Sequence, residues 1–253
     1  MDLGLKGLRA LVTGGSKGIG LRCAEILASE GASVAICART GADVDAVVAR
    51  LKATGATAHG TAVDVSDKAA LEAWVARSAK ALGGIDIVIG NVSALAVADD
   101  EAAWHAGFET DMMHSVRLVN AAMPWLEKSM AASITLVSSV SGREVDFTGP
   151  AYGAFKAAIV HYAQGMAFKL AAKGIRANTV SPGNTYFDGG IWQNIETNMP
   201  DLYAEALALN PTGRMAKPEE IARGVVFLAS PASSFTTGTN LVIDGALTKG
   251  VQF

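Results

Sequence analysis

The run LRALVTGGSKGIG, residues 8–20, joins a strand, a turn and the start of a helix in thirteen residues. Its apolar first part predicts a strand over residues 8–13, and a helix is expected over residues 18–30, with Gly31 just past its end. Three glycines after the strand and at the start of the helix permit a tight turn: Gly14, Gly18 and Gly20. A buried strand that enters a helix through such a turn is typical of the first unit of a parallel α/β sheet.

The remaining chain continues the alternation of strand and helix. Further strands are expected at residues 33–38, 58–63, 85–89, 133–137, 177–180 and 241–243. Helices are expected at residues 42–53, 68–82, 104–129, 151–173 and 218–229. Short apolar strands separated by helices predict a single-domain, Rossmann-type, doubly wound parallel sheet of about seven strands, with helices on both faces. No linker-like or repetitive segment interrupts residues 1–253, so one domain is expected.

The composition excludes several classes of function. The chain has 253 residues, of which 50% are hydrophobic, and a net charge of −3 without a basic run, which argues against nucleic-acid binding. No apolar run reaches membrane-spanning length, and the start lacks a signal-peptide core. The two cysteines, Cys23 and Cys37, fit a buried core in a cytoplasmic protein. The four histidines lack metal-ligand spacing, so no metal site is expected.

The glycine-rich turn predicts a dinucleotide site. Its glycines let a pyrophosphate approach the backbone, and the helix N-terminus supplies amide donors and a favourable dipole. The residues expected to hold the cofactor here are Gly14, Ser16, Lys17, Gly18, Ile19 and Gly20. The spacing Gly-x3-Gly-x-Gly departs from the commonest fingerprint, and an ordinary glycine-rich turn is the alternative.

A second informative run, residues 139–156, reads SVSGREVDFTGPAYGAFK. Tyr152 and Lys156 lie four apart on the helix expected there, so they share one face, while Ser139 follows the strand at residues 133–137. A cation near a phenol favours the phenolate, which lets Tyr152 give or take a proton near neutral pH. The hydroxyl of Ser139 can hydrogen-bond a substrate oxygen as its charge changes. An exposed Tyr–Lys pair on a helix is the alternative.

Together these two runs resemble the short-chain dehydrogenase/reductase family, of the Tyr-x-x-x-Lys type. Further stretches along the chain are similar to family motifs: Asp64-Val65 to its adenine-contacting pair, Asn91 to its N-N-A-G motif, and Pro182-Gly183 and Thr185 to the stretch beside the nicotinamide. The resemblance implies that Ser139, Tyr152 and Lys156 are catalytic and that Tyr152 and Lys156 also bind the nicotinamide ribose.

The chain departs from the family pattern at Asp111, where an asparagine is usual. In the family, that residue holds a water through its backbone carbonyl and so connects the catalytic lysine to solvent. Asp111 has the same carbonyl, so it is retained as a catalytic residue, and a nearby carboxylate would favour the charged form of Lys156. His114, three residues later, is interpreted as forming a solvated or interface pair with Asp111.

The end of the second strand predicts a preference for NADP(H) over NAD(H). An NAD site usually has a carboxylate there, to bind the ribose 2′-hydroxyl, whereas this chain has Arg39. The planar guanidinium of Arg39 can bind a 2′-phosphate, and Lys17 adds a second positive charge.

The substrate region is expected to be largely apolar, which suits a carbonyl or secondary alcohol of a fairly apolar molecule. Its lining is predicted to be Ser93, Val140, Val145, Phe147, Phe187 and Trp192, beneath a lid at about residues 185–212 that the resemblance implies. The neighbouring charges of Arg143, Glu144 and Asp146 are interpreted as a solvated loop. Two alternatives stay open: a 3-oxoacyl-thioester reductase acting on acyl-carrier-protein substrates, and a catalytically silent NADP-binding sensor.

The outer face of the Tyr152 helix predicts a homo-oligomer. It carries small or apolar residues where a monomer would carry charges: Ala154, Ala158, His161, Gly165, Phe168 and Ala172. A four-helix contact with the preceding long helix of a two-fold partner would cover this face. We expect a homotetramer, with a dimer as the second choice and with no membrane or nucleic-acid partner.

Overall fold

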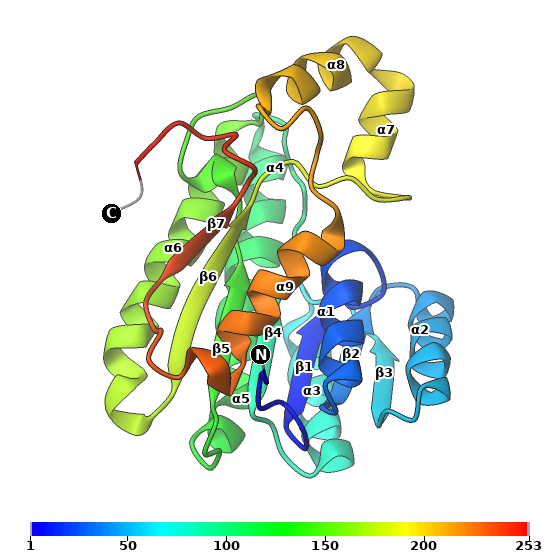
Figure 1. Ribbon diagram of the computed structural model, residues 1–253, viewed down its shortest axis with the longest axis vertical. Coiled ribbons are helices and arrows are strands. Elements are labelled where there is room, and N and C mark those ends of the chain that lie inside the picture. The colour runs from blue at the N-terminus through cyan, green and yellow to red at the C-terminus, as the bar shows by residue number, and fades with distance from the viewer. Residues whose placement is uncertain (1, 252–253) are drawn as a thin grey trace.

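The computed structural model describes residues 2–251, and its centre is one parallel sheet with helices on both faces (Figure 1). The strand order is β3-β2-β1-β4-β5-β6-β7, and every neighbouring pair is parallel. The strands are β1 (Arg9–Thr13), β2 (Ser33–Ala38), β3 (Ala58–Ala62), β4 (Ile87–Gly90), β5 (Ser133–Val137), β6 (Arg176–Pro182) and β7 (Asn240–Ile243). The predicted doubly wound fold is therefore confirmed.

Helices cover the sheet in two groups. One face packs against α3 (Lys68–Leu82), α5 (His114–Leu126) and α6 (Pro150–Leu170), and the other against α1 (Gly18–Ser29), α2 (Gly41–Ala53) and α9 (Pro218–Ala229). Side chains alternate along each strand, so Leu11 of β1 enters the first core while Ala10 and Val12 enter the second. Both faces of the sheet are thus buried, as parallel sheets require.

Three short helices lie outside these two layers. The helix α4 (Glu101–Gly107) precedes α5, whereas α7 (Ile191–Asn198) and α8 (Pro200–Leu209) stand beyond the carboxyl ends of the strands (Figure 1). The pair α7–α8 has its own apolar cluster, built on Trp192, Ile195, Ala206 and Met215. It is therefore packed as a separate unit above the sheet edge.

Local signals account for most element bounds. Four elements begin and end at the residues expected from the sequence: 33–38, 68–82, 133–137 and 218–229. The helix α3 begins where the Asp67 carboxylate accepts the amide of Ala70, and it ends at Gly83 in the left-handed conformation. The strand β4 begins two residues later than expected, directly after Asp86, whose carboxylate binds the side chain of Arg9.

The helical region expected over residues 104–129 is observed over residues 101–126, but it is not a regular α-helix throughout. The chain there forms α4, then a π-helical turn, η1 (Phe108–Met113), and then α5. A π-turn adds a residue to the helical repeat and so rotates the side chains that follow it. Asp111 lies in this turn and is buried.

Candidate active site

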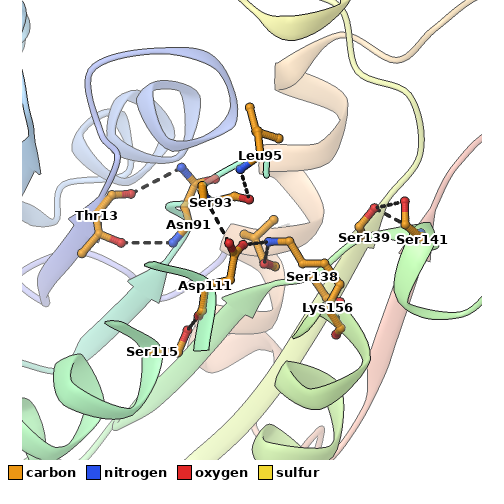
Figure 2. A network of polar contacts seen from close by, with 12 residues as sticks. Thr13, Asn91, Ser93, Leu95, Asp111, Ser115, Ser138, Ser139, Ser141 and Lys156 are labelled. Atoms are coloured by element: carbon orange, nitrogen blue, oxygen red, sulfur yellow. Dashed lines mark hydrogen bonds and ion pairs between the residues drawn. The ribbon is translucent and has the colours of Figure 1, made fainter. Parts of the chain in front are cut away.

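The glycine-rich turn lies where the strand order reverses, between β1 and β4. Its shape is held by Asn91, whose side-chain amide donates to the Thr13 carbonyl at 3.3 Å (Figure 2) and to the Gly14 carbonyl at 3.4 Å. A Cβ on Gly20 would collide with the Gly14 carbonyl, so only glycine fits there. The first amides of α1 have no side-chain cap. Free amides beside backbone that a ligand can approach closely fit the pyrophosphate of a dinucleotide.

A cavity of about 470 Å³ extends from this turn past the ends of β2 and β3. It is lined by seven of the residues expected to bind a cofactor: Gly14, Ser16, Lys17, Arg39, Asp64, Val65 and Asn91. Hydrogen bonds from the side chain and then the backbone of Ser66 lower the pKa of Asp64. Lys17 is not a free cation, because its Nζ lies 3.2 Å from Asp43 of α2, an ion pair that sequence reasoning missed.

A second cavity, of about 340 Å³, joins Ser139, Tyr152 and Lys156 to the other end of the turn. It is lined by Lys17, Gly18, Ile19, Asn91, Ser93, Ser139, Tyr152, Lys156, Pro182, Gly183, Thr185, Phe187 and Trp192. Ser139 is delivered by the end of β5, whereas Tyr152 and Lys156 come from one face of α6. The hydroxyl of Ser138 fixes these two elements together, since it donates to the Lys156 carbonyl at 2.7 Å.

Ser139 takes part in a short hydrogen-bonded chain. Its hydroxyl donates to Ser141 Oγ at 3.1 Å, and Ser141 Oγ donates to Asp146 Oδ2 at 2.6 Å. The other oxygen of Asp146 accepts the amide and hydroxyl of Thr148. Asp146 is exposed, as expected for a solvated loop, and its carboxylate is also hydrogen-bonded within that loop. The spacing Ser-x-Ser and the turn-forming Asp-x-Thr were the available sequence signals.

Lys156 is buried and paired. Its Nζ lies 3.0 Å from Asp111 Oδ1, and both side chains are only 2% exposed (Figure 2). Nζ also donates to the Val137 carbonyl at 3.3 Å and lies 5.5 Å from the centre of the Tyr152 ring. Burial acts to lower the pKa of Lys156, but the charges of Asp111 and then Tyr152 outweigh it, and the pKa is raised.

The contact between Asp111 and Lys156 runs through the carboxylate, not through the backbone carbonyl that the family comparison had emphasised. The carbonyl of Asp111 accepts the hydroxyl of Ser115 at 2.9 Å. Its other carboxylate oxygen, Oδ2, accepts the amide of Ala94 at 3.0 Å. The carboxylate is thus held on both sides and aimed at the lysine.

The interpretation of His114 as part of a solvated or interface pair is wrong. The side chain is 0% exposed within its own chain, and neither ring nitrogen has a hydrogen-bond partner among the described residues. Burial lowers the pKa of His114 to about 4; the charge of Asp111 opposes this shift and the charge of Lys156 adds to it. The imidazole is therefore neutral near pH 7, beside the Asp111–Lys156 ion pair.

The predicted substrate lining is divided between two cavities. Ser93, Phe187 and Trp192 line the 340 Å³ cavity that also holds Tyr152, but Val140, Val145 and Phe147 line a different one, of about 590 Å³. This larger cavity lies between the loop before α6, the helix α8 and the last residues described. Phe147 and Trp192, whose rings pack edge to face at 5.4 Å, connect the two.

Phe187 lies directly on the glycine-rich turn. A Cβ on Gly18 would come within 2.7 Å of the Phe187 ring, and Gly18 also has a left-handed backbone with φ of +52°. The segment that leads into α7 therefore covers the N-terminus of α1. Among residues 2–251, no cluster of three or more His, Cys, Asp or Glu side chains offers a metal site. Within the same range, no helix is long and apolar enough to cross a membrane.

Known proteins share both this sequence and this fold. A family model described as enoyl-(acyl carrier protein) reductase matches residues 14–248. Isoepoxydon dehydrogenase of Penicillium expansum is 42% identical over 258 residues, which cover 100% of this chain and 99% of that protein. The 3-oxoacyl-(acyl-carrier-protein) reductase of Vibrio harveyi is 33% identical, over 97% of this chain and 99% of that protein.

A solved structure gives the same result in three dimensions. A short chain oxidoreductase from Pseudomonas aeruginosa PAO1, described as NADPH-bound and as containing an atypical catalytic center, superposes with a TM-score of 0.88. It is 31% identical, and the match covers 96% of this chain and 98% of that one. Similarity that extends along nearly the whole chain, in sequence and in fold, makes this protein a member of the short-chain dehydrogenase/reductase family, an oxidoreductase that acts on CH–OH or C=O groups.

Proposed function

We propose that the protein transfers a hydride between NADP(H) and the carbonyl or secondary alcohol carbon of a fairly apolar small molecule. One observation carries this proposal: Ser139, Tyr152 and Lys156 line the same cavity of about 340 Å³ as the glycine-rich turn. A proton donor and the reactive end of a dinucleotide then reach one substrate from the same space. The carbonyl oxygen can then receive a proton while the carbonyl carbon receives a hydride, as reduction requires.

Tyr152 is the proposed proton carrier. It donates its phenolic proton to the substrate oxygen in reduction and takes one back in oxidation. Lys156, held at 5.5 Å from the ring centre, favours the phenolate that this exchange creates. Ser139 orients the substrate oxygen, with its own hydroxyl positioned by Ser141. When bound, the reduced nicotinamide supplies the hydride, and Asn91, Pro182, Gly183 and Thr185 are the proposed contacts around it.

The preference for NADP(H) rests on the end of β2. Arg39 lines the 470 Å³ cavity, and Lys17 lines it from the glycine-rich turn. The carboxylate of Asp43 offsets part of the Lys17 charge, so Arg39 is the proposed main contact of the 2′-phosphate. The similarity to an NADPH-bound oxidoreductase from Pseudomonas aeruginosa is consistent with this choice.

The proposed substrate has an apolar part larger than its reacting group. Phe187 and Trp192 face the reacting centre, and Phe147 stands between that centre and the 590 Å³ cavity. We propose that residues 185–212, which include α7 and α8, form a lid over this region, because they pack mainly on their own apolar cluster. A lid with its own core can move with little disturbance of the sheet.

The proposed assembly is a homotetramer, with a dimer second, in the cytoplasm. The outer face of α6 is exposed at Ala154, His161, Gly165 and Phe168, and the Phe168 side chain is 90% exposed. An apolar face of this kind is stabilised by contact with another copy. Both cysteines are buried free thiols, which fits a reducing compartment.

A substrate panel tests the proposed activity. Purified protein would be given NADPH or NADH with apolar ketones, sugars, dicarboxylates or 3-oxoacyl thioesters, and cofactor absorbance followed. We expect turnover with NADPH and apolar ketones. Preference for acyl thioesters would favour a 3-oxoacyl-thioester reductase, the activity of the similar Vibrio harveyi protein. Tight NADPH binding without turnover on any substrate class would favour a silent sensor.

The variant Tyr152→Phe tests whether the Tyr152 hydroxyl transfers the proton to the substrate. The change removes one hydroxyl and keeps the ring, so turnover should fall by about 10²–10⁴-fold while NADPH still binds. NADPH binding, measured by fluorescence titration, is the control for intact folding. Near-normal turnover in this variant would refute the role of Tyr152.

A further inference from the structure

The buried ion pair between Asp111 and Lys156 is the least expected feature of the active site. The two side chains come from different elements, the π-turn η1 and the helix α6, and meet at 3.0 Å with 2% exposure each (Figure 2). Isolated charges are too costly to leave unpaired in a protein interior, whereas a fixed pair is tolerated. Asp111 is fixed, because Ala94 binds its second carboxylate oxygen and Ser115 binds its carbonyl.

Few other groups set the charge around Lys156. On its own helix, Tyr152 is the titratable neighbour, and the strand β5 offers only the neutral Val137 carbonyl. The helix α5 contributes His114, which is neutral near pH 7 because burial lowers its pKa to about 4. Lys17 supplies a cation on the far side of the cavity, already paired with Asp43. Among these described neighbours, Asp111 is the one anion in contact with Lys156.

A fixed negative charge acts on both members of the proton-transfer pair in the same direction. It stabilises the protonated form of each group near it, whichever of the two gives up its proton first. Tyr152 and Lys156 interact, so their titration belongs to the pair rather than to one residue. The sign of the effect is therefore independent of where the proton is assigned.

We propose that Asp111 is a positioning residue that keeps the Tyr152–Lys156 pair protonated to higher pH, and so extends the pH range in which this site donates a proton to a carbonyl. The proposal rests on the proposed function and adds a preferred direction to it. An active site whose proton is retained at higher pH is suited to reduction. With a neutral residue at position 111, the same pair would release its proton earlier as pH rises.

Asp111→Asn tests this proposal through the pH profile of carbonyl reduction. The profile of kcat/KM with saturating NADPH should fall at lower pH in the variant, with its basic limb displaced by about one pH unit or more. A basic limb that stays within about 0.3 pH unit of the wild type, or that moves to higher pH, overturns the proposal. If Asp111→Asn does not fold, Asp111→Ser is a second neutral variant with the same expected shift, measured with NADPH present to stabilise it.

Two matched variants separate the charge from general damage. Asp86→Asn removes another buried, paired carboxylate, which binds Arg9 at the amino ends of the strands, far from the cavity. It should lower stability and leave the basic limb in place. Asp111→Glu keeps the charge near Lys156 and should retain most of the wild-type limb. A shift in Asp111→Glu as large as that in Asp111→Asn would contradict the proposal.

A second measurement needs no substrate. The ultraviolet absorbance of tyrosinate can be titrated in wild type and in Tyr152→Phe, and their difference follows Tyr152 alone. The same difference in an Asp111→Asn background should appear at lower pH, by about one unit. If no carbonyl is ever reduced, the proposed function fails while this titration still decides the role of Asp111. An unchanged difference titration rejects that role even in an active enzyme.

Discussion

The residue at position 111 determines what the buried Lys156 contacts. An aspartate there places a carboxylate 3.0 Å from Lys156 Nζ, and the π-turn that carries it is what aims the side chain inward. Beside it, His114 is buried with both ring nitrogens unpaired among the described residues. We expect different consequences from these neighbours: Asp111 is the proposed influence on proton transfer, whereas His114 should affect the pH dependence of stability.

His114 should make the protein less stable in mild acid. Its pKa is lowered from 6.5 to about 4 in the folded state, mainly by burial, whereas the unfolded chain takes up a proton near 6.5. The neutral form of His114 therefore makes no penalty above about pH 6.5. As pH falls toward 4, the free energy of unfolding decreases, by up to about 3 kcal/mol. Urea unfolding of His114→Leu should lack this part of the slope, and equal slopes for both proteins would exclude the role.

Arg39→Ala should raise the Michaelis constant for NADPH and leave that for NADH nearly unchanged. Loss of one charged hydrogen bond costs about 1.5–3 kcal/mol, which corresponds to about tenfold or more. Arg77→Ala, an exposed arginine on α3, is the control and should change neither constant. Asp43→Asn frees Lys17 from its ion pair and should lower the Michaelis constant for NADPH. Better wild-type efficiency with NADH would end the NADP(H) proposal.

At the scale of elements, the glycine-rich turn and the start of the proposed lid depend on each other. Phe187 contacts Gly18, and the same glycine has the left-handed backbone that leads into α1. The proposed cofactor site is thus bounded by β1, α1 and the segment before α7. A substitution in the turn should disturb the lid as well as the cofactor.

Gly18→Ala should weaken NADPH binding and lower stability. The left-handed backbone costs about 1–2 kcal/mol for alanine, and the new Cβ meets the Phe187 ring. Adding Phe187→Ala to this variant should restore only the part of the lost stability that the clash with the ring causes. Calorimetry and NADPH titration would measure both, and unchanged binding in Gly18→Ala would remove the turn from the cofactor site.

At the scale of the whole molecule, the two layers of helices leave one apolar face uncovered. The outer side of α6 is exposed along its length, with Phe168 near its end. On the facing helix α5, Val116 and Met123 are half-buried, but Val119 is buried within its own chain. A contact between copies would therefore centre on α6 more than the sequence pattern indicated.

Ala158→Glu combined with Phe168→Glu should dissociate the proposed tetramer. Two carboxylates on the apolar face would have to lose water in the assembly, so smaller species and lower stability are expected. Ala73→Glu with Ala76→Glu, on the exposed side of α3, adds the same charge elsewhere and should leave the assembly intact. Light scattering distinguishes the outcomes, and a wild-type monomer at micromolar concentration would disprove the assembly.

The strands and most helices were predictable because their signals are local. The period of apolar residues, the caps and the glycines around α3, β2, β5 and α9 act within a few residues of each other. The grouping of the glycine-rich turn with Ser139, Tyr152 and Lys156 was also foreseeable, since parallel strands bring their carboxyl ends to one edge. These features need no knowledge of how distant side chains are placed.

The remaining features depend on tertiary packing. Asp111 and Lys156 lie far apart in the chain, and their contact requires both the π-turn and the position of α6 against β5. Three other features likewise depend on where whole elements lie. They are the burial of His114, the pairing of Lys17 with Asp43, and the placement of Val140, Val145 and Phe147 in the 590 Å³ cavity. A periodic pattern states which face of an element is apolar, but the electrostatic field at a side chain is a sum over neighbours that only the folded chain brings together.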